Sequence, residues 1–236
     1  MKRFYSQNIQ SNYIYLEEEE AQHCAKVLRC KTNDKVEILN GSGSLYEGII
    51  SNIQKHEVQI EIIKIVRQEI ENKQKLSVAI CPTKNPARLE WFLEKATEIG
   101  IANIFPILTD RTEKETIKQE RLQQIIVSAA KQSGQLYFPV LHQIQAFKNI
   151  ISEEHNGIQQ QFIAHCEAEK KPLKSVYKKE NTALILIGPE GDFSPTEIQA
   201  ALNRNYIPIS LGNSILRVET AGVVACSTIQ LLNDES

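Results

Sequence analysis

The chain of 236 residues carries 27 lysines and arginines against 29 aspartates and glutamates, for a net charge of −2. This near balance excludes a polycationic protein that coats nucleic acid, although a local basic groove is compatible with it. Charged residues make up 24% and hydrophobic residues 42% of the chain, which is ordinary for a globular protein able to bury a core without disulfides or metals.

Apolar runs in the sequence are short. Runs such as Ala183–Ile187 fall far below the roughly 20 residues that a membrane-spanning helix needs. The N-terminus lacks the apolar core of a secretory signal. The five cysteines and five histidines are scattered without metal-ligand spacing. We therefore expect a cytoplasmic protein with free thiols and no metal site.

The first 75 residues predict a small β-barrel. Three β-branched, partly alternating segments are expected as strands, at 35–39, 45–51 and 57–66. The Gly- and Ser-rich segment 40–44 predicts a hairpin between the first two strands, and the apolar spacing of 17–29 predicts a helix. The polar stretch 67–75 reads as a linker, which gives expected domains over 1–72 and 73–236.

From residue 76 onward, strand patterns alternate with helix patterns, as is typical of a parallel α/β sheet. The expected strands cover 76–80, 103–108, 139–144, 159–166, 182–188 and 207–212. The expected helices cover 87–99, 113–133, 146–154, 195–204 and 218–232. Gly100 and Gly134 are positioned to end two of these helices. Ser194 and Glu197 form the pattern of a capping box.

Two glycine-containing loops follow strands and precede helices. The first, GPEGDFS at 188–194, has two glycines that let a ligand approach the backbone, and a helix N-terminus follows it. A tight structural turn is the alternative. The second, LGNSILR at 211–217, combines apolar side chains suited to an adenine ring with a terminal arginine. We expect the two loops to end neighbouring strands and to form one pocket.

Two charged or titratable features at these strand ends have open interpretations. Arg217 has no role in a core, so it is either functional or paired in a salt bridge with Glu219 or Glu190. The pair His165-Cys166 follows another strand and is either structural or a Cys–His nucleophile pair, for which no third orienting residue stands out.

These segments carry a family resemblance. GPEGDFSPTE (188–197) together with LGNSILRVETA (211–221) resembles the signature of the SPOUT methyltransferases, within them the RsmE-type family that methylates N3 of a uridine in 16S ribosomal RNA. Segments 23–29, 89–100 and 129–139 resemble further motifs of that family in the same order, so the resemblance runs over essentially the whole chain. Three positions depart from the family pattern, namely Asp192, Lys131 and Gln135.

The resemblance implies an α/β fold in which a PUA-like β-barrel precedes a parallel-sheet SPOUT domain with a trefoil knot. It also implies S-adenosylmethionine (SAM) as cofactor, ribosomal RNA in the small subunit as partner, and no membrane. The implied cofactor-binding residues are Gly188, Glu190, Gly191, Leu211, Gly212, Ile215 and Leu216. The implied RNA-binding residues are His23, Lys26, Arg29, Lys131 and Gln132.

Arg217 is the expected catalytic residue, because a permanently charged guanidinium can stabilise the anion formed when uridine N3 loses its proton. The family resemblance also implies a homodimer. We expect helix 218–232 in the interface, since its apolar residues cover more than one face; they are Val223, Val224, Ala225, Ile229 and Leu232. Two alternatives stay open: a SPOUT enzyme that acts on a ribose 2′-OH or another RNA, and a non-catalytic RNA-binding protein that retains the fold.

Overall fold

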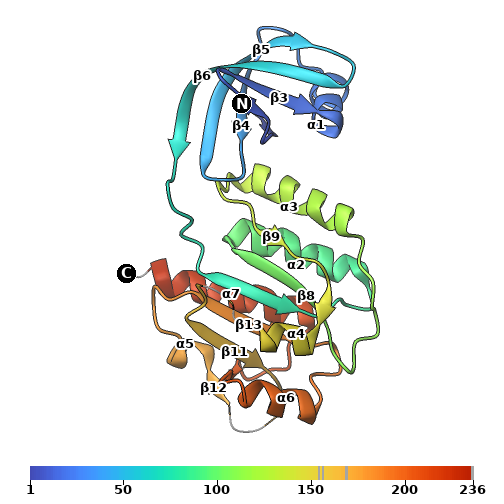
Figure 1. Ribbon diagram of the computed structural model, residues 1–236, viewed down its shortest axis with the longest axis vertical. Coiled ribbons are helices and arrows are strands. Elements are labelled where there is room, and N and C mark those ends of the chain that lie inside the picture. The colour runs from blue at the N-terminus through green and yellow to red at the C-terminus, as the bar shows by residue number, and fades with distance from the viewer. Residues whose placement is uncertain (154, 156, 168–169, 235–236) are drawn as a thin grey trace. The chain divides into compact units, whose positions relative to one another are not determined.

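The structure is a computed structural model that describes residues 1–153, 155, 157–167 and 170–234 (Figure 1). Its contacts divide the chain into two compact units. The first holds Met1–Asn72 and Val127–Phe138, and the second holds Lys73–Ile126 and the chain from Pro139 onward. None of the helices in the described ranges combines the length and the apolar character needed to cross a membrane.

The first unit is built on one six-stranded sheet with the order β1-β4-β5-β6-β3-β2. Its strands are β1 (Lys2–Tyr5), β2 (Ile9–Gln10), β3 (Tyr13–Glu17), β4 (Lys35–Leu39), β5 (Ser44–Ile53) and β6 (Glu57–Gln68). Only β1 and β4 pair in parallel. The three strands expected from the sequence are confirmed. So is the hairpin, in which the Asn40 side chain accepts from the backbone N–H groups of Ser42 and Ser44 at 2.9 Å each.

The helix expected at 17–29 is present but changes its winding. An α-helix, α1 (Glu18–Gln22), continues directly as a π-helix, η1 (His23–Val27). Its apolar side, including Ala21 and Cys24, is buried in the core of the first unit. π-Helices are rare and often occur at functional sites, and no sequence pattern distinguished this one from ordinary helix.

The first unit also contains residues from the middle of the chain. Helix α3 (Gln119–Ser133) ends in it, where the Arg3 guanidinium donates to the Lys131 carbonyl at 2.7 Å. The Lys131 ammonium forms an ion pair with Glu20, and Leu136 is buried in a small cluster with two leucines of the sheet. The residues that make these contacts are far apart in the sequence, so no local sequence pattern predicts them.

The second unit is a parallel sheet with the order β10-β8-β7-β13-β11-β14-β12, with β9 also paired to β8. Its strands are β7 (Leu76–Ile80), β8 (Asn103–Leu108), β9 (Val140–Leu141), β10 (Gln145–Ala146), β11 (Gln160–Ala164), β12 (Lys171–Pro172), β13 (Ala183–Ile187) and β14 (Ile207–Ser210). All of these pairings are parallel, so the expected parallel α/β sheet is confirmed.

Helices cover both faces of this sheet. The helices are α2 (Pro86–Ile99), α3, α4 (Phe147–Ser152), α5 (Leu173–Val176), α6 (Pro195–Leu202) and α7 (Val218–Asp234). In the central strand β13, Ile185 faces the core shared with α2 and α7, whereas Leu184 faces the core shared with α4 and α6. Burial on both faces explains why this strand is a continuous apolar run.

Several helix and strand ends differ from the expectation. Gly100 ends α2 at a φ of 106°, and the Ser194–Glu197 capping box is present as expected. Helix α3, in contrast, begins at Gln119 rather than 113; Ile117, in the irregular segment before it, packs against the core. The expected strand 139–144 is only two residues long as β9. Helix α4 stops at Ser152 instead of 154, and residue 154 itself lies outside the described residues.

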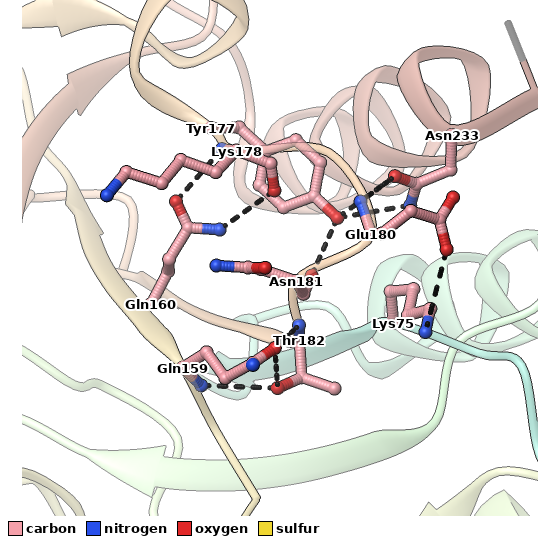
Figure 2. A network of polar contacts seen from close by, with 9 residues as sticks. All are labelled: Lys75, Gln159, Gln160, Tyr177, Lys178, Glu180, Asn181, Thr182 and Asn233. Carbon is pink, nitrogen blue, oxygen red and sulfur yellow. Dashed lines mark hydrogen bonds and ion pairs between the residues drawn. The ribbon is translucent and has the colours of Figure 1, made fainter. Parts of the chain in front are cut away.

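A polar network fixes the far end of α7 (Figure 2). The side-chain oxygen of Asn233 accepts from the Glu180 backbone N–H at 2.9 Å, and its amide nitrogen donates to the Tyr177 hydroxyl at 3.1 Å. The Gln160 side chain, at the start of β11, exchanges two hydrogen bonds with the Lys178 backbone, at 2.9 and 3.1 Å. This end of α7 is therefore held at the amino-terminal edge of the sheet, so its first turn lies toward the carboxyl edge.

Candidate active site

The candidate site lies where parallel strands end at the carboxyl edge of the second unit's sheet. The two glycine-containing loops follow β13 and β14. We expected these strands to be neighbours, but β11 lies between them. Ala164, the last residue of β11, pairs with both Ile187 and Ile209. The expectation was wrong because strand order in a parallel sheet does not follow chain order. The segment that begins at His165 is thereby brought between the two loops.

The loop after β13 needs glycine for a steric reason. A Cβ atom on Gly188 would lie 3.1 Å from the Phe193 ring, which is 1% exposed. Gly191 is less constrained, since its Cβ would meet only Arg111, at 3.5 Å. The Gly191 carbonyl accepts a hydrogen bond from the Arg111 guanidinium at 2.7 Å. Gly188 thus serves the tight turn, whereas Gly191 leaves room for a ligand.

Asp192 departs from the glycine that the family resemblance leads us to expect, and it adopts the left-handed backbone at a φ of 62°. Its carboxylate accepts from the Cys166 backbone N–H and from the Phe193 backbone N–H, each at 2.8 Å. Aspartate tolerates this conformation better than most residues. The substitution therefore preserves the backbone geometry and ties the β11 end to the loop.

The residues that follow β11 do not form an activated nucleophile. Burial lowers the pKa of His165, and neither ring nitrogen has a hydrogen-bond partner among the described residues. Burial raises the pKa of the Cys166 thiol, and the Asp192 carboxylate raises it further. A thiol that stays protonated at neutral pH is a poor nucleophile, so the Cys–His pair has no support from the geometry.

The loop after β14 is open toward solvent. Gly212 has a φ of 145° and nothing within 4 Å of the position of a Cβ. Ile215 is 87% exposed, Leu216 is half-buried, and Leu211 packs against the core. An apolar side chain held in water beside free backbone is suited to covering a flat apolar ligand.

A cavity of about 590 Å³ adjoins this loop. Its lining comes from the first two turns of α2, the first turn of α7 and the loop between β14 and α7: Ala87, Arg88, Trp91, Ile215, Leu216, Arg217, Glu219 and Thr220. The two helices approach closely because Gly222 lies against Phe92; a Cβ there would be 2.4 Å from the ring. This volume is typical of small-molecule sites.

The charges of this cavity are unequally paired. The Arg88 guanidinium lies 4.0 Å from a Glu190 carboxylate oxygen and 3.8 Å from one of Glu219. Glu219 is 8% exposed, and its other carboxylate oxygen has no partner among the described residues. Arg217 is exposed and forms no ion pair within the described part of the chain. The alternative pairing of Arg217 with Glu219 or Glu190 is therefore not seen among the described residues; the cation nearest to both carboxylates is Arg88.

The structure thus brings together part of the expected site. Ile215, Leu216 and Arg217 line the cavity, and Glu190 reaches its wall through Arg88. The remaining expected cofactor residues, Gly188, Gly191, Leu211 and Gly212, lie on the adjacent loops and do not line it. Sequence analysis missed Arg88 and Trp91. The sequence signal that could have pointed to these residues is the Asn85-Pro86 pair, which marks the start of α2; the Asn85 side chain caps this helix.

In the first unit, three of the expected RNA-binding residues lie within the π-helix or two residues after it, and the other two lie near the end of α3. Lys26 and Arg29 are exposed, and Arg29 has a φ of 49°. His23 is half-buried, with its ring edge-on to Phe4 at 6.2 Å between centroids. The Lys131 side chain is largely buried by its ion pair with Glu20. It thus holds the first unit together rather than presenting a free cation.

Gln132, the remaining residue of the expected RNA-binding set, is exposed at the end of α3. Contact of these residues with RNA stays a prediction.

The chain is similar to known proteins over most of its length. A family model of the RNA methyltransferase domain matches residues 70–230, and one of the RNA methyltransferase PUA domain matches 16–63. Ribosomal RNA small subunit methyltransferase E of Mesomycoplasma hyopneumoniae is 30% identical over 228 residues, covering 94% of this chain and 96% of its own.

Two solved structures are similar over nearly the full length. A probable rRNA-methyltransferase from Porphyromonas gingivalis is 34% identical, with a TM-score of 0.88 and 99% of each chain covered. A putative methyltransferase from Legionella pneumophila, in complex with the bound cofactor SAM, is 26% identical, with a TM-score of 0.87 and coverage of 98% and 97%.

Proposed function

This chain belongs to the RNA methyltransferase family that includes ribosomal RNA small subunit methyltransferase E, and from this membership we propose that it transfers a methyl group from SAM to N3 of a specific uridine in 16S ribosomal RNA. The observation that carries the proposal is the unpaired Arg217 guanidinium on the wall of the cavity beside the glycine-containing loops. The acceptor base of this reaction develops negative charge, which a free guanidinium can stabilise.

The carboxyl edge of the sheet fits SAM. The open space at Gly212 admits a ligand to the backbone, and the exposed Ile215 offers an apolar surface to an adenine ring. The SAM complex of the Legionella relative supports this assignment. When bound, SAM supplies an electrophilic methyl group. The residues assigned to hold it are Gly188, Glu190, Gly191, Leu211, Gly212, Ile215 and Leu216.

Arg217 is assigned to the acceptor base. Uridine N3 carries a proton and becomes a good nucleophile only when that proton is removed. The negative charge of the deprotonated base spreads onto the two flanking carbonyl oxygens. The planar donor fork of arginine can hold such an oxygen without giving up its own proton. Because Arg217 is exposed and forms no ion pair with any described residue, its positive charge is available to the substrate.

The first unit is assigned to RNA recognition. Lys26 and Arg29 expose two cations on and directly after the π-helix. The net charge of −2 argues against broad coating of RNA and favours recognition of a folded target by shape. Ribosomal RNA within the small subunit is such a target, and it places the reaction in the cytoplasm.

A second copy of the chain is the proposed partner of α7. Of the expected interface residues, Ala225 and Ile229 are buried in the chain's own core, and Val223 and Leu232 pack against that core, so these four support the helix rather than an interface. Val224 is half-buried on another side, and Leu231 is 63% exposed. These outward apolar residues are the ones a homodimer would cover.

The test of the proposed function is methylation of defined RNA. The purified protein is incubated with methyl-labelled SAM and either free 16S RNA or assembled small subunits that lack the modification. We expect one methyl group on a single uridine, located at N3 by mass spectrometry of the digested RNA. A ribose 2′-O-methyl product, or no incorporation into either substrate, would refute the proposal.

A further inference from the structure

We propose that Trp91 is the surface on which the target base of the RNA stacks, so that the α2–α7 cavity is the acceptor-base subsite. The inference rests on the proposed function and adds a positioning residue to it. None of the site residues expected from the sequence lies on α2.

The exposure of Trp91 is the first observation. Its side chain is 42% exposed, whereas the next two residues of α2, Phe92 and Leu93, are fully buried. Tryptophan is the largest apolar side chain, and leaving it in water loses the free energy that burial would supply. Trp91 also lines the cavity, so part of this exposed indole surface borders the space that a planar ligand could enter.

The position of Trp91 is firmly held. The Asn85 side chain caps the helix N-terminus by accepting from the Ala87 N–H at 3.1 Å. One turn further on, Phe92 packs against Gly222 of α7 so closely that a Cβ would not fit. A stacking surface on such a helix is preorganised, which reduces the entropy lost on binding.

The chemistry of the remaining lining favours a pyrimidine base. The cavity combines the Trp91 indole with the apolar Ile215 and the free cation of Arg217. Uracil is planar and carries two carbonyl oxygens, so it can stack on the indole while an oxygen accepts from the guanidinium. The carboxylate of Glu219 is paired with Arg88, which reduces its repulsion of an anionic base.

The methyl donor is assigned to adjacent space rather than to this cavity. Gly191 and Gly212, where the backbone leaves room for a ligand, do not line it. The two subsites share only the segment 215–217, which ends in Arg217. Donor and acceptor would then meet at that segment, as transfer between them requires. To enter, the target base must leave its stack in the RNA, and the indole replaces the stacking it loses.

Intrinsic fluorescence tests the contact without relying on activity. Trp91 is the single tryptophan of the chain, so selectively excited emission reports on this position alone. The probes are a 16S RNA fragment that the protein methylates, the same fragment with an abasic site at the methylated nucleotide, and SAM alone. We expect the intact fragment to quench the emission and the other two to leave it nearly unchanged. Equal quenching by the abasic fragment, or quenching by SAM alone, would overturn the assignment.

Substitution provides the second arm. Trp91→Ala should raise the KM for RNA about 5- to 150-fold, the range expected for loss of one base–aromatic stack, while the affinity for SAM stays unchanged. Trp91→Phe retains an aromatic face and should recover most of the loss. Val140→Ala, which removes an apolar side chain that is 54% exposed outside this cavity, is the matched control. An unchanged KM in a folded Trp91→Ala protein would overturn the proposal.

The two proposals fail in different ways. If the wild-type protein methylated no uridine N3, the proposed function would fall irrespective of Trp91. If the wild-type protein methylated it normally and Trp91→Ala did so with unchanged KM, only the stacking assignment would fall. A fluorescence change that depended on dilution and not on RNA would assign Trp91 to contact with a second copy of the chain instead, and would equally refute the stacking role.

Discussion

Replacing Arg217 with alanine separates a catalytic from a structural role, because the structure predicts a large loss of turnover with almost no change in stability. The side chain is exposed and forms no ion pair with any described residue. Its loss should therefore change the free energy of unfolding by no more than about 0.5 kcal/mol, as for other surface sites without special contacts. Turnover should fall by ~10²–10³, which corresponds to roughly 2.7–4 kcal/mol of lost transition-state stabilisation.

The assay is single-turnover methylation at saturating SAM and RNA, accompanied by urea unfolding and by equilibrium dialysis of SAM. Arg217→Lys should recover only part of the rate, because an ammonium lacks the planar donor fork. Arg204→Ala removes an exposed arginine two residues after the end of α6, outside the cavity, and should leave the rate unchanged. Near-normal turnover in Arg217→Ala, or a loss of stability well above 1 kcal/mol, would show that Arg217 is structural.

Four further predictions address packing, the cofactor loop, RNA and pH. Gly222→Ala places a Cβ 2.4 Å from the Phe92 ring, and the resulting overpacking, which costs about 1–3 kcal/mol, should exceed the ~1 kcal/mol gained in helix propensity. The midpoint of urea unfolding should therefore fall. A second substitution, Phe92→Leu, should restore part of that loss. Gly191→Val should abolish SAM binding in equilibrium dialysis while unfolding stays cooperative, and unchanged affinity would remove this loop from the site. Arg29→Ala should lower the slope of log K against log salt for RNA binding by about one, and a wild-type slope would count against this surface. Burial lowers the pKa of His165 in the folded chain, so the unfolded chain binds more protons once the pH falls below about 6.5. The free energy of unfolding should therefore decline from that pH toward the lower folded-state pKa. His165→Gln should reduce this decline, as measured by urea unfolding at several pH values.

The regular elements of the fold could be predicted well where local patterns determine them. Strand β7 and helix α2 match their expected ranges within a residue, because a continuous apolar run and an Asn-Pro start with a Gly end are local signals. The short strands β1 to β3 were missed, since two to five residues carry too little periodicity to register. The π-helix was missed because its side chains have the same apolar spacing as an α-helix over one turn.

The candidate site could be predicted only in part. The loop residues were found because glycines after apolar strands are visible in the sequence, and Arg217 stood out as a charge without a core role. Arg88 and Trp91 could not be found in the same way. Their place in the cavity depends on the close contact of α2 with α7, which follows them by more than 100 residues. The trefoil knot is implied by family resemblance alone and stays a prediction.

The strand order of the second unit has a consequence for how the chain is made. Strand β7 pairs with β8 on one side, but its other neighbour, β13, is translated about 100 residues later. At ~5–20 residues per second, one edge of the apolar strand β7 stays open for about 5–20 s on the ribosome. An unpaired apolar edge is a template for aggregation. The nascent chain should therefore depend on chaperone cover during this interval, even though the finished sheet has β7 enclosed on both sides.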